Sequence, residues 1–251
     1  MNRFIQIISC IILIGFVQNN ILANSILIDP GHGGDDFGAT TIINKKHIYE
    51  KDLALSISLK LFEKLKKKKY DVYLTRSIDR NIGLDERALL ANKLNTDLYI
   101  SIHINSNKDI HSQGIETYYL DNHNDSAVEK VEKVENINWI GKEPKEQVVN
   151  QILTDLVIQQ TVTSSKKLAT FIHSKLKVVG ERFDMPNRGI KAGLFYVLAL
   201  AKRPSILVEA GFISSEKEVK KLMNEQFQED YAAALFEGIE SYFKDKSKTR
   251  N

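Results

Sequence analysis

Two histidines of this chain accompany apolar runs that are typical of buried strands. His32 follows the run 26–28 in the segment SILIDPGHGGDDFGAT, and His103 lies in YISIHINSN. Glu209 follows a third such run in PSILVEAGF, and Glu50 begins a long amphipathic segment. Two imidazoles and a carboxylate, with no thiol, are the ligand set of a catalytic zinc site that keeps one coordination position open. The residue types therefore predict a metal centre that activates water.

The side chains of this set are expected to meet at one edge of a sheet. Ligands of open α/β sheets bind at the carboxyl ends of strands, and His32, His103 and Glu209 each occupy such a position. Glycines 31, 33 and 34 flank His32, so the backbone and a substrate can approach a metal closely there.

Simpler interpretations of the same residues stay open at this point. A single histidine after a strand is more often structural than a ligand, and Glu50 alone would be an ordinary helix-start residue. Glu209 alone would pair with a nearby cation, while His47 competes with Glu50 for a place in the site. The remaining candidates are interpreted as solvated or as plain loop residues: His111, His123, His173, Asp35 and Asp36.

The elements that position these residues alternate between strand and helix. Apolar runs predict strands over 25–29, 70–76, 97–105, 114–120, 193–201 and 204–214. Helical periodicity predicts helices over 50–70, 83–95, 152–176 and 217–243. This alternation indicates an α/β fold, and the absence of a flexible linker indicates a single domain.

The first 23 residues differ from the rest of the chain. Arg3 is followed by an apolar stretch over 4–17 and by Ala23, which is the basic, apolar and small-residue layout of a secretory signal peptide. Cleavage after Ala23 would leave 24–251 as the mature domain, and an uncleaved anchor is the alternative. Cys10 is the only cysteine, so the mature protein would have no disulfide and no thiolate ligand. The formal net charge of +3 is too small to indicate a nucleic-acid partner.

The motifs together resemble a known enzyme family. The blocks ILIDPGHGGDDFGA, EKDLALSISLKLFEKL, VYLTR, ISIHINS with GIETYYL, and PSILVEAGFISSEKE occur in the order found in zinc-dependent N-acetylmuramoyl-L-alanine amidases of the amidase-3 family. The resemblance runs from about 25 to 243. It implies a mixed, mostly parallel β-sheet flanked by helices on both faces, and hydrolysis of the amide bond between the lactyl group of muramic acid and L-alanine in peptidoglycan.

The same resemblance assigns roles to individual residues. It implies that His32, Glu50 and His103 hold Zn²⁺ and that Glu209 is the catalytic glutamate, which takes a proton from the attacking water and passes it to the alanine nitrogen. Asn105 is expected to line the cleft. Arg76 is expected to play a structural role by pairing with a carboxylate. Two rival functions are another zinc hydrolase of the cell wall, such as a peptidase or deacetylase, and a non-catalytic wall-binding module.

A polar insert over 121–163 interrupts the alternation. Its segment SAVEKVEKVENINWIG predicts a short helix with Val128, Val131 and Val134 on one side and Glu135 near that face. Cell-division amidases of the family carry an autoinhibitory helix here, so the resemblance implies that Glu135 gives the zinc a fourth ligand. A solvated surface excursion is the alternative.

The insert also implies a partner and a location. The segment after it, ILTDLVIQQTVTSSKKLA, resembles the part of related amidases that an activator with a LytM-type domain engages, and an ordinary helix core is the alternative. We therefore expect a periplasmic monomer that acts on peptidoglycan in cell-wall remodelling and daughter-cell separation.

Overall fold

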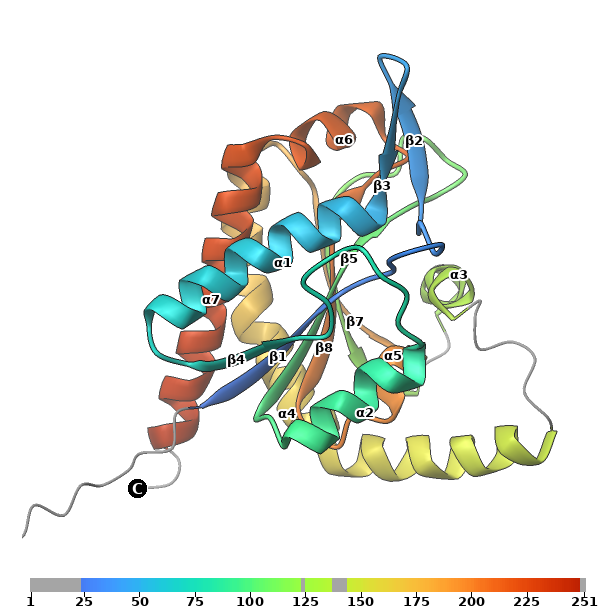
Figure 1. Ribbon diagram of the computed structural model, residues 1–251, viewed down its shortest axis with the longest axis vertical. Coiled ribbons are helices and arrows are strands. Elements are labelled where there is room, and N and C mark those ends of the chain that lie inside the picture. The colour runs from blue at the N-terminus through green and yellow to red at the C-terminus, as the bar shows by residue number, and fades with distance from the viewer. Residues whose placement is uncertain (1–23, 123–124, 137–143, 249–251) are drawn as a thin grey trace, which may run out of the picture.

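A six-stranded sheet forms the centre of the computed structural model, which describes residues 24–122, 125–136 and 144–248 (Figure 1). The strands, in chain order, are β1 Ser25–Pro30, β4 Asp71–Leu74, β5 Leu98–Asn105, β6 Ile115–Leu120, β7 Asn187–Gly193 and β8 Ser205–Phe212. Their order across the sheet is β4-β1-β5-β8-β6-β7. The proposed signal peptide, 1–23, lies outside the described residues.

The sheet is mixed and mostly parallel, as the resemblance implied. Only β6 and β8 pair antiparallel, while the other neighbouring pairs within the sheet are parallel. The carboxyl ends of β1, β5 and β8 therefore share one edge of the sheet with the amino ends of β6 and β7. Every residue of β5 and β8 is buried, which is expected where helices cover both faces of a sheet.

Seven helices of the described chain surround the sheet. They are α1 Glu50–Lys67, α2 Leu84–Leu94, α3 Ser126–Glu135, α4 Pro144–Arg182, α5 Tyr196–Ala199, α6 Glu216–Leu222 and α7 Glu225–Lys248. Figure 1 shows α1 and α7 on one side of the sheet and α2 and α5 on the other. None of these helices combines the length and the apolar character needed to cross a membrane.

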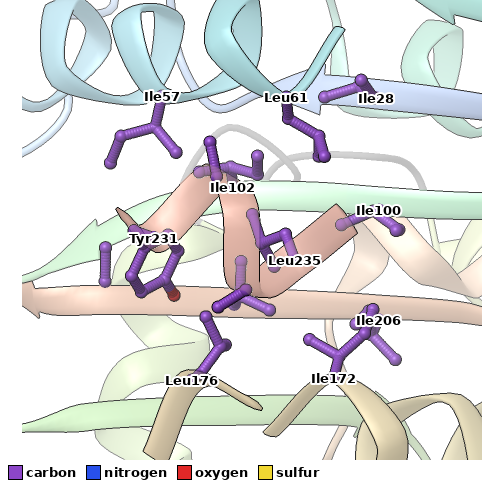
Figure 2. Packing of buried hydrophobic residues seen from close by; sticks show 14 of the residues in the cluster. Ile28, Ile57, Leu61, Ile100, Ile102, Ile172, Leu176, Ile206, Tyr231 and Leu235 are labelled. Atoms are coloured by element: carbon purple, nitrogen blue, oxygen red, sulfur yellow. The ribbon is translucent and has the colours of Figure 1, made fainter. Parts of the chain in front are cut away.

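Alternating side chains of the strands feed two hydrophobic clusters, one on each face. The larger cluster packs Ile28, Ile100 and Ile102 of the sheet against α1, α4 and α7, which contribute Ile57, Ile172 and Leu235, among others (Figure 2). The smaller cluster contains Leu27, Tyr99 and Leu207 with residues of α2 and α5. The period of two along each strand explains why neighbouring residues reach opposite clusters.

Three local elements differ from the sequence prediction. The run 193–201, predicted as a strand, ends β7 at Gly193 and then forms the short helix α5. Its apolar residues are buried in the smaller cluster, and periodicity alone does not separate a short buried helix from a buried strand. The polar strand β7 and the hairpin of β2 Thr40–Ile43 with β3 Lys46–Tyr49 were not predicted.

Candidate metal centre

Four segments that are distant in sequence meet at the carboxyl edge of the sheet. His32 lies two residues beyond β1, His103 lies near the end of β5, and Glu50 is the first residue of α1. Glu135 is the last residue of α3. One nitrogen or oxygen atom from each of these four side chains lies within 4.8 Å of all the others. The structure therefore brings the three predicted ligands together with the glutamate of the insert.

The distances inside this group, which we call the metal cluster, suit a tetrahedral ion. Glu50 Oε1 lies 3.2 Å from His32 Nε2 and 3.1 Å from His103 Nδ1. Glu135 Oε2 lies 2.8 Å from His103 Nδ1 and 3.5 Å from His32 Nε2. Ligand atoms about 2.0–2.1 Å from a tetrahedral zinc are spaced roughly 3.3–3.5 Å apart, so a small adjustment of these side chains would hold one ion.

The charges of the metal cluster also favour a cation. Burial by itself lowers the pKa of an imidazole, but the charge of Glu50 raises the pKa of His32 well above its usual value. The Glu135 carboxylate, against the same effect of burial, raises the pKa of His103 to about 10. His32 Nε2 and Glu135 Oε2 are buried, and their close contacts within the metal cluster lack hydrogen-bond geometry. A divalent ion would satisfy these atoms and would displace the imidazole protons as it binds.

Backbone geometry brings His32 into this position. His32 has a left-handed backbone with φ of 57°, which is uncommon for a residue with a side chain. Asp36 Oδ1 lies 2.9 Å from His32 Nδ1, so the carboxylate directs Nε2 toward the metal cluster, as outer partners of metal-binding histidines commonly do. A Cβ atom on Gly31 would come within 2.5 Å of the His103 ring. Asp36, interpreted above as a plain loop residue, is thus part of the site.

Two buried arginines hold the loop that carries His32. Arg87 donates to the carbonyl oxygen of His32 at 2.7 Å and to that of Pro30 at 2.8 Å. Arg76 donates to the carbonyl oxygen of Gly31 at 2.7 Å. The expected carboxylate partner of Arg76 was therefore wrong, since within the described residues its hydrogen bonds go to backbone carbonyls. Its structural role follows from these contacts.

Arg87 also pairs with Asp29, which is fully buried beneath the loop. Arg87 Nη1 lies 2.7 Å from Asp29 Oδ1, and hydroxyl groups of Thr75, Tyr99 and Ser101 donate to the same carboxylate. Burial alone would raise the pKa of Asp29, but the charge of Arg87 and these hydrogen bonds lower it from 3.8 to about 2. The stabilisation that this depressed pKa provides is complete above pH 3.8 and is lost as the pH falls through about 2.

We expect Arg87→Leu to lower the free energy of unfolding by about 3–5 kcal/mol at pH 7, because it leaves the Asp29 carboxylate buried without a counter-ion. Urea denaturation followed by circular dichroism measures this change. Arg182→Leu, which removes an exposed arginine paired with Asp230, is the matched control and should cost less than about 1 kcal/mol. Equal losses in the two variants would contradict the role of Arg87.

Glu209 lies beside the metal cluster without belonging to its four ligand atoms. It is the register partner of His103 in the pairing of β5 with β8. Its side chain is fully buried, and neither carboxyl oxygen has a hydrogen-bond partner among the described residues. Burial and the nearby charge of Glu135 raise the pKa of Glu209 well above its usual value. The carboxyl group is thus free to bind and release a proton.

The helix α3 brings Glu135 to the metal cluster, and its buried face agrees with the predicted one except at Val134. Val134 is 48% exposed, whereas Val128 is 1% and Glu135 8% exposed. The inward face therefore follows a seven-residue spacing from Val128 to Glu135, which corresponds to two helical turns. The Glu132 carboxylate accepts from the backbone N–H of Leu194, so the helix is also attached to the segment after β7.

Asn136 adds a second attachment at the end of α3. Its amide donates to the carbonyl oxygen of Leu194 at 2.9 Å and accepts from the N–H of Tyr196 at 3.0 Å. Residues 137–143 of the insert, with the sole tryptophan, lie outside the described residues.

The remaining histidines and Asn105, which the sequence analysis also considered, lie outside the metal cluster or outside the described residues. His47 lies on β3 and is not part of the metal cluster. His173 is buried and hydrogen-bonded to Thr117 and Asn187, so the expectation that it is solvated was wrong. Asn105 is buried and lines a cavity beside α3. His111 is exposed, and His123 lies outside the described residues.

Known proteins share this sequence pattern and this fold. A family model described as N-acetylmuramoyl-L-alanine amidase matches residues 26–241. N-acetylmuramoyl-L-alanine amidase AmiA of Escherichia coli is 31% identical over 224 residues, which cover 87% of this chain and 75% of that protein. An E. coli AmiC is 33% identical, with 88% and 53% covered. The crystal structure of an N-acetylmuramoyl-L-alanine amidase from Clostridium difficile 630 superimposes with a TM-score of 0.67 at 32% identity, covering 89% of this chain and 98% of that one.

Proposed function

Since the chain belongs to the amidase-3 family of N-acetylmuramoyl-L-alanine amidases, we propose that His32, Glu50 and His103 hold a zinc ion and that Glu209 is its catalytic carboxylate. The protein is a peptidoglycan amidase with a metal-binding cluster of histidine and glutamate. The observation that carries the assignment is the convergence of these three side chains from separate segments, with Glu209 adjacent but outside the group of ligand atoms.

The chemistry divides between the ion and the protein. Zinc, when bound, supplies a Lewis acid that acidifies water and polarises the lactyl carbonyl. Glu209 accepts a proton from the attacking water at its carboxylate, because neither of its oxygens is engaged by another described residue. The protonated carboxyl then donates to the alanine nitrogen as the amide bond breaks. Asp36 keeps His32 in the tautomer that presents Nε2 to the ion.

Digestion of purified sacculi tests this function directly. We expect the enzyme to release intact stem peptides that begin with L-alanine, and to leave glycan strands with free lactyl groups. Zinc chelation should abolish both products, and added zinc should restore them. Mass analysis distinguishes these products from those of a peptidase, which would shorten the stem, and of a deacetylase, which would leave the peptides attached.

We further propose that α3 is an autoinhibitory helix and that Glu135 supplies a fourth ligand to the zinc. Support comes from the 2.8 Å distance between Glu135 Oε2 and His103 Nδ1 and from the attachment of α3 through Glu132 and Asn136. A carboxylate in the fourth position excludes the water that must attack the substrate.

Glu135→Ala is expected to raise basal hydrolysis of sacculi at least ~10-fold, which corresponds to a bias of about 1.4 kcal/mol toward the open site. Release of dyed fragments from labelled sacculi measures the rate, and metal analysis checks that the zinc content is unchanged. Glu129→Ala, at an exposed position of the same helix, is the matched control. Unchanged basal rates in both Glu135→Ala and a deletion of 124–150 would remove the autoinhibitory role.

An activator and a periplasmic location complete the proposal. The amino-terminal half of α4 extends beyond the sheet (Figure 1) and exposes Ile152, Leu153 and Leu156. We propose that a partner with a LytM-type domain binds these residues and displaces α3. The signal-peptide pattern of 1–23 supports export of 24–251 to the periplasm, where the enzyme would act in daughter-cell separation.

A further inference from the structure

A cavity of about 550 Å³ lies beside α3, next to the metal cluster. The sheet contributes Asn105, Glu116, Arg188, Lys191 and Phe212 to its lining, and α3 adds Lys130 and Lys133. A smaller cavity of about 60 Å³ lies at the metal cluster itself, because His32, His103 and Glu135 line it together with residues 82–84. Val134 lines both, so both cavities border α3, and the larger one lies next to the space at the metal cluster. We call the larger one the β7 cavity.

The wall of the β7 cavity carries a net positive charge that is fixed in place. The buried Glu116 carboxylate accepts from Arg188 Nε at 2.5 Å and from Lys191 Nζ at 2.6 Å. Asn105 and Tyr118 donate to its other oxygen at 2.7 and 2.8 Å. One carboxylate therefore positions two cations, and one positive charge remains uncompensated in this group.

Arg188 has the geometry of an anion receptor. Only its Nε atom is hydrogen-bonded within the described residues, so both terminal nitrogens are available. Its guanidinium group lies over the ring of Phe212 at 5.2 Å, and its side chain is 35% exposed. A planar guanidinium that is held by one edge and stacked on an aromatic ring is suited to bidentate binding of a carboxylate.

The substrate has a carboxylate on only one side of the bond that is cut. The sugar side is neutral, because its lactyl carboxyl group is consumed in the amide. The peptide side carries an α-carboxylate on the second residue, a D-glutamate that continues the stem through its γ-carboxyl group. Glycan and peptide must extend from the metal cluster in different directions. Charge complementarity therefore places the peptide in the β7 cavity.

The distances along the sheet suit this placement. Glu116 is the register partner of Glu209, and adjacent strands lie about 4.7–4.9 Å apart. Arg188 is hydrogen-bonded to Glu116, so its guanidinium lies about one strand spacing and one hydrogen bond beyond Glu209. One residue of extended peptide, roughly 3.5 Å long, together with its own carboxylate spans such a step.

We propose that Arg188, supported by Lys191, binds the α-carboxylate of the second residue of the stem peptide and selects substrates in which this group is ionised. The inference depends on the amidase activity of the chain but not on the autoinhibitory role of α3. It assigns specificity to β7, an edge strand that contributes no residue to the metal cluster.

The test compares two soluble muramoyl peptides that extend to the third stem residue and differ only at the second. One carries the α-carboxylate and the other the α-carboxamide. We expect the wild-type enzyme to favour the carboxylate by about 10- to 100-fold in kcat/KM. Arg188→Gln should reduce this preference to less than about 3-fold by slowing the carboxylate substrate, and Arg188→Lys should retain part of it. The comparison uses the ratio of kcat/KM for the two substrates. A closed site lowers both values by the same factor, so this ratio does not depend on the fraction of enzyme whose site is open.

Binding of the released peptides gives a readout that needs no turnover. Calorimetry should show that the wild-type protein binds the carboxylate peptide more tightly than the amidated one, and that Arg188→Gln binds both equally. Arg182→Gln, an exposed arginine outside the cavity, is the control and should behave as wild type. Equal binding of the two peptides by wild type, or an unchanged preference in Arg188→Gln, would overturn the proposal. A failure of the Glu209 assignment would leave this binding difference intact.

Discussion

Glu209→Gln is expected to retain a full equivalent of zinc and to lose amide hydrolysis by at least ~10²-fold, the usual contribution of a positioned general base. The substitution keeps the size of the side chain and removes only its ability to accept a proton. The carboxyl oxygens of Glu209 have no hydrogen-bond partner among the described residues, so the new amide breaks no bond to them. Metal analysis and product release from sacculi measure the two effects separately.

The same substitution at an exposed glutamate is the control for Glu209→Gln. Glu216→Gln changes an exposed residue at the start of α6 and should leave both zinc content and rate unchanged. Loss of the metal from Glu209→Gln, combined with retention of metal by His103→Ala, would reverse the assigned roles.

The chemistry of the site is largely readable from sequence because its residues sit at strand and helix ends. His32, His103 and Glu209 follow apolar runs, and such runs predict where a buried strand carries its side chains to one edge of a sheet. The convergence of His32 with His103 follows from the parallel pairing of β1 with β5. The identity of Glu50 as the third member depended on the family resemblance, since a glutamate at a helix start has a simpler explanation.

The parts that were missed depend on contacts between segments that have no local signature. Asp36 reaches His32 only because the glycine-rich loop turns back on itself, with Gly33 and Asp36 bridged. Arg76 donates to backbone carbonyls rather than to a carboxylate. Every residue has a backbone carbonyl, so the sequence cannot indicate which one an arginine will bind. The helix α5 was predicted as a strand because a short, largely buried apolar run has no distinctive period.

A rotation of α3 by one residue changes which side chains face the metal cluster. A stripe through Val128, Val131 and Val134 and a stripe ending at Glu135 differ by one residue, or about 100° of rotation. The sequence prediction placed Val134 inward with Glu135 near that face, whereas the structure keeps Val128 and Val131 packed, exposes Val134 and buries Glu135. A buried carboxylate costs free energy unless cations compensate it. The buried position of Glu135 is explained by the two imidazoles beside it, which compensate its charge.

His103→Ala should weaken zinc binding by more than the roughly 10- to 100-fold that loss of an outer partner of a metal ligand costs, and should reduce hydrolysis to background. Among the four described residues of the metal cluster, His103 alone lies on a strand of the sheet, and its Nδ1 lies near both Glu50 and Glu135. Asp36→Asn, which weakens the orientation of His32 without removing a residue of the metal cluster, should fall within the 10- to 100-fold range. Zinc titration with a competing chelator measures both affinities.

The number of protons released on zinc binding is an independent test of whether His103 binds the metal. The pKa of His103 is raised to about 10 and that of His32 is also raised, so at pH 7 zinc must displace protons from both imidazoles. Calorimetric titrations in buffers of different ionisation enthalpy count these protons, and His103→Ala should release one fewer than wild type. An unchanged proton count with unchanged zinc affinity would show that His103 is not a ligand. The metal would then have to be held by Glu50, His32 and Glu135 alone, and displacement of α3 would release the ion instead of exposing it to substrate.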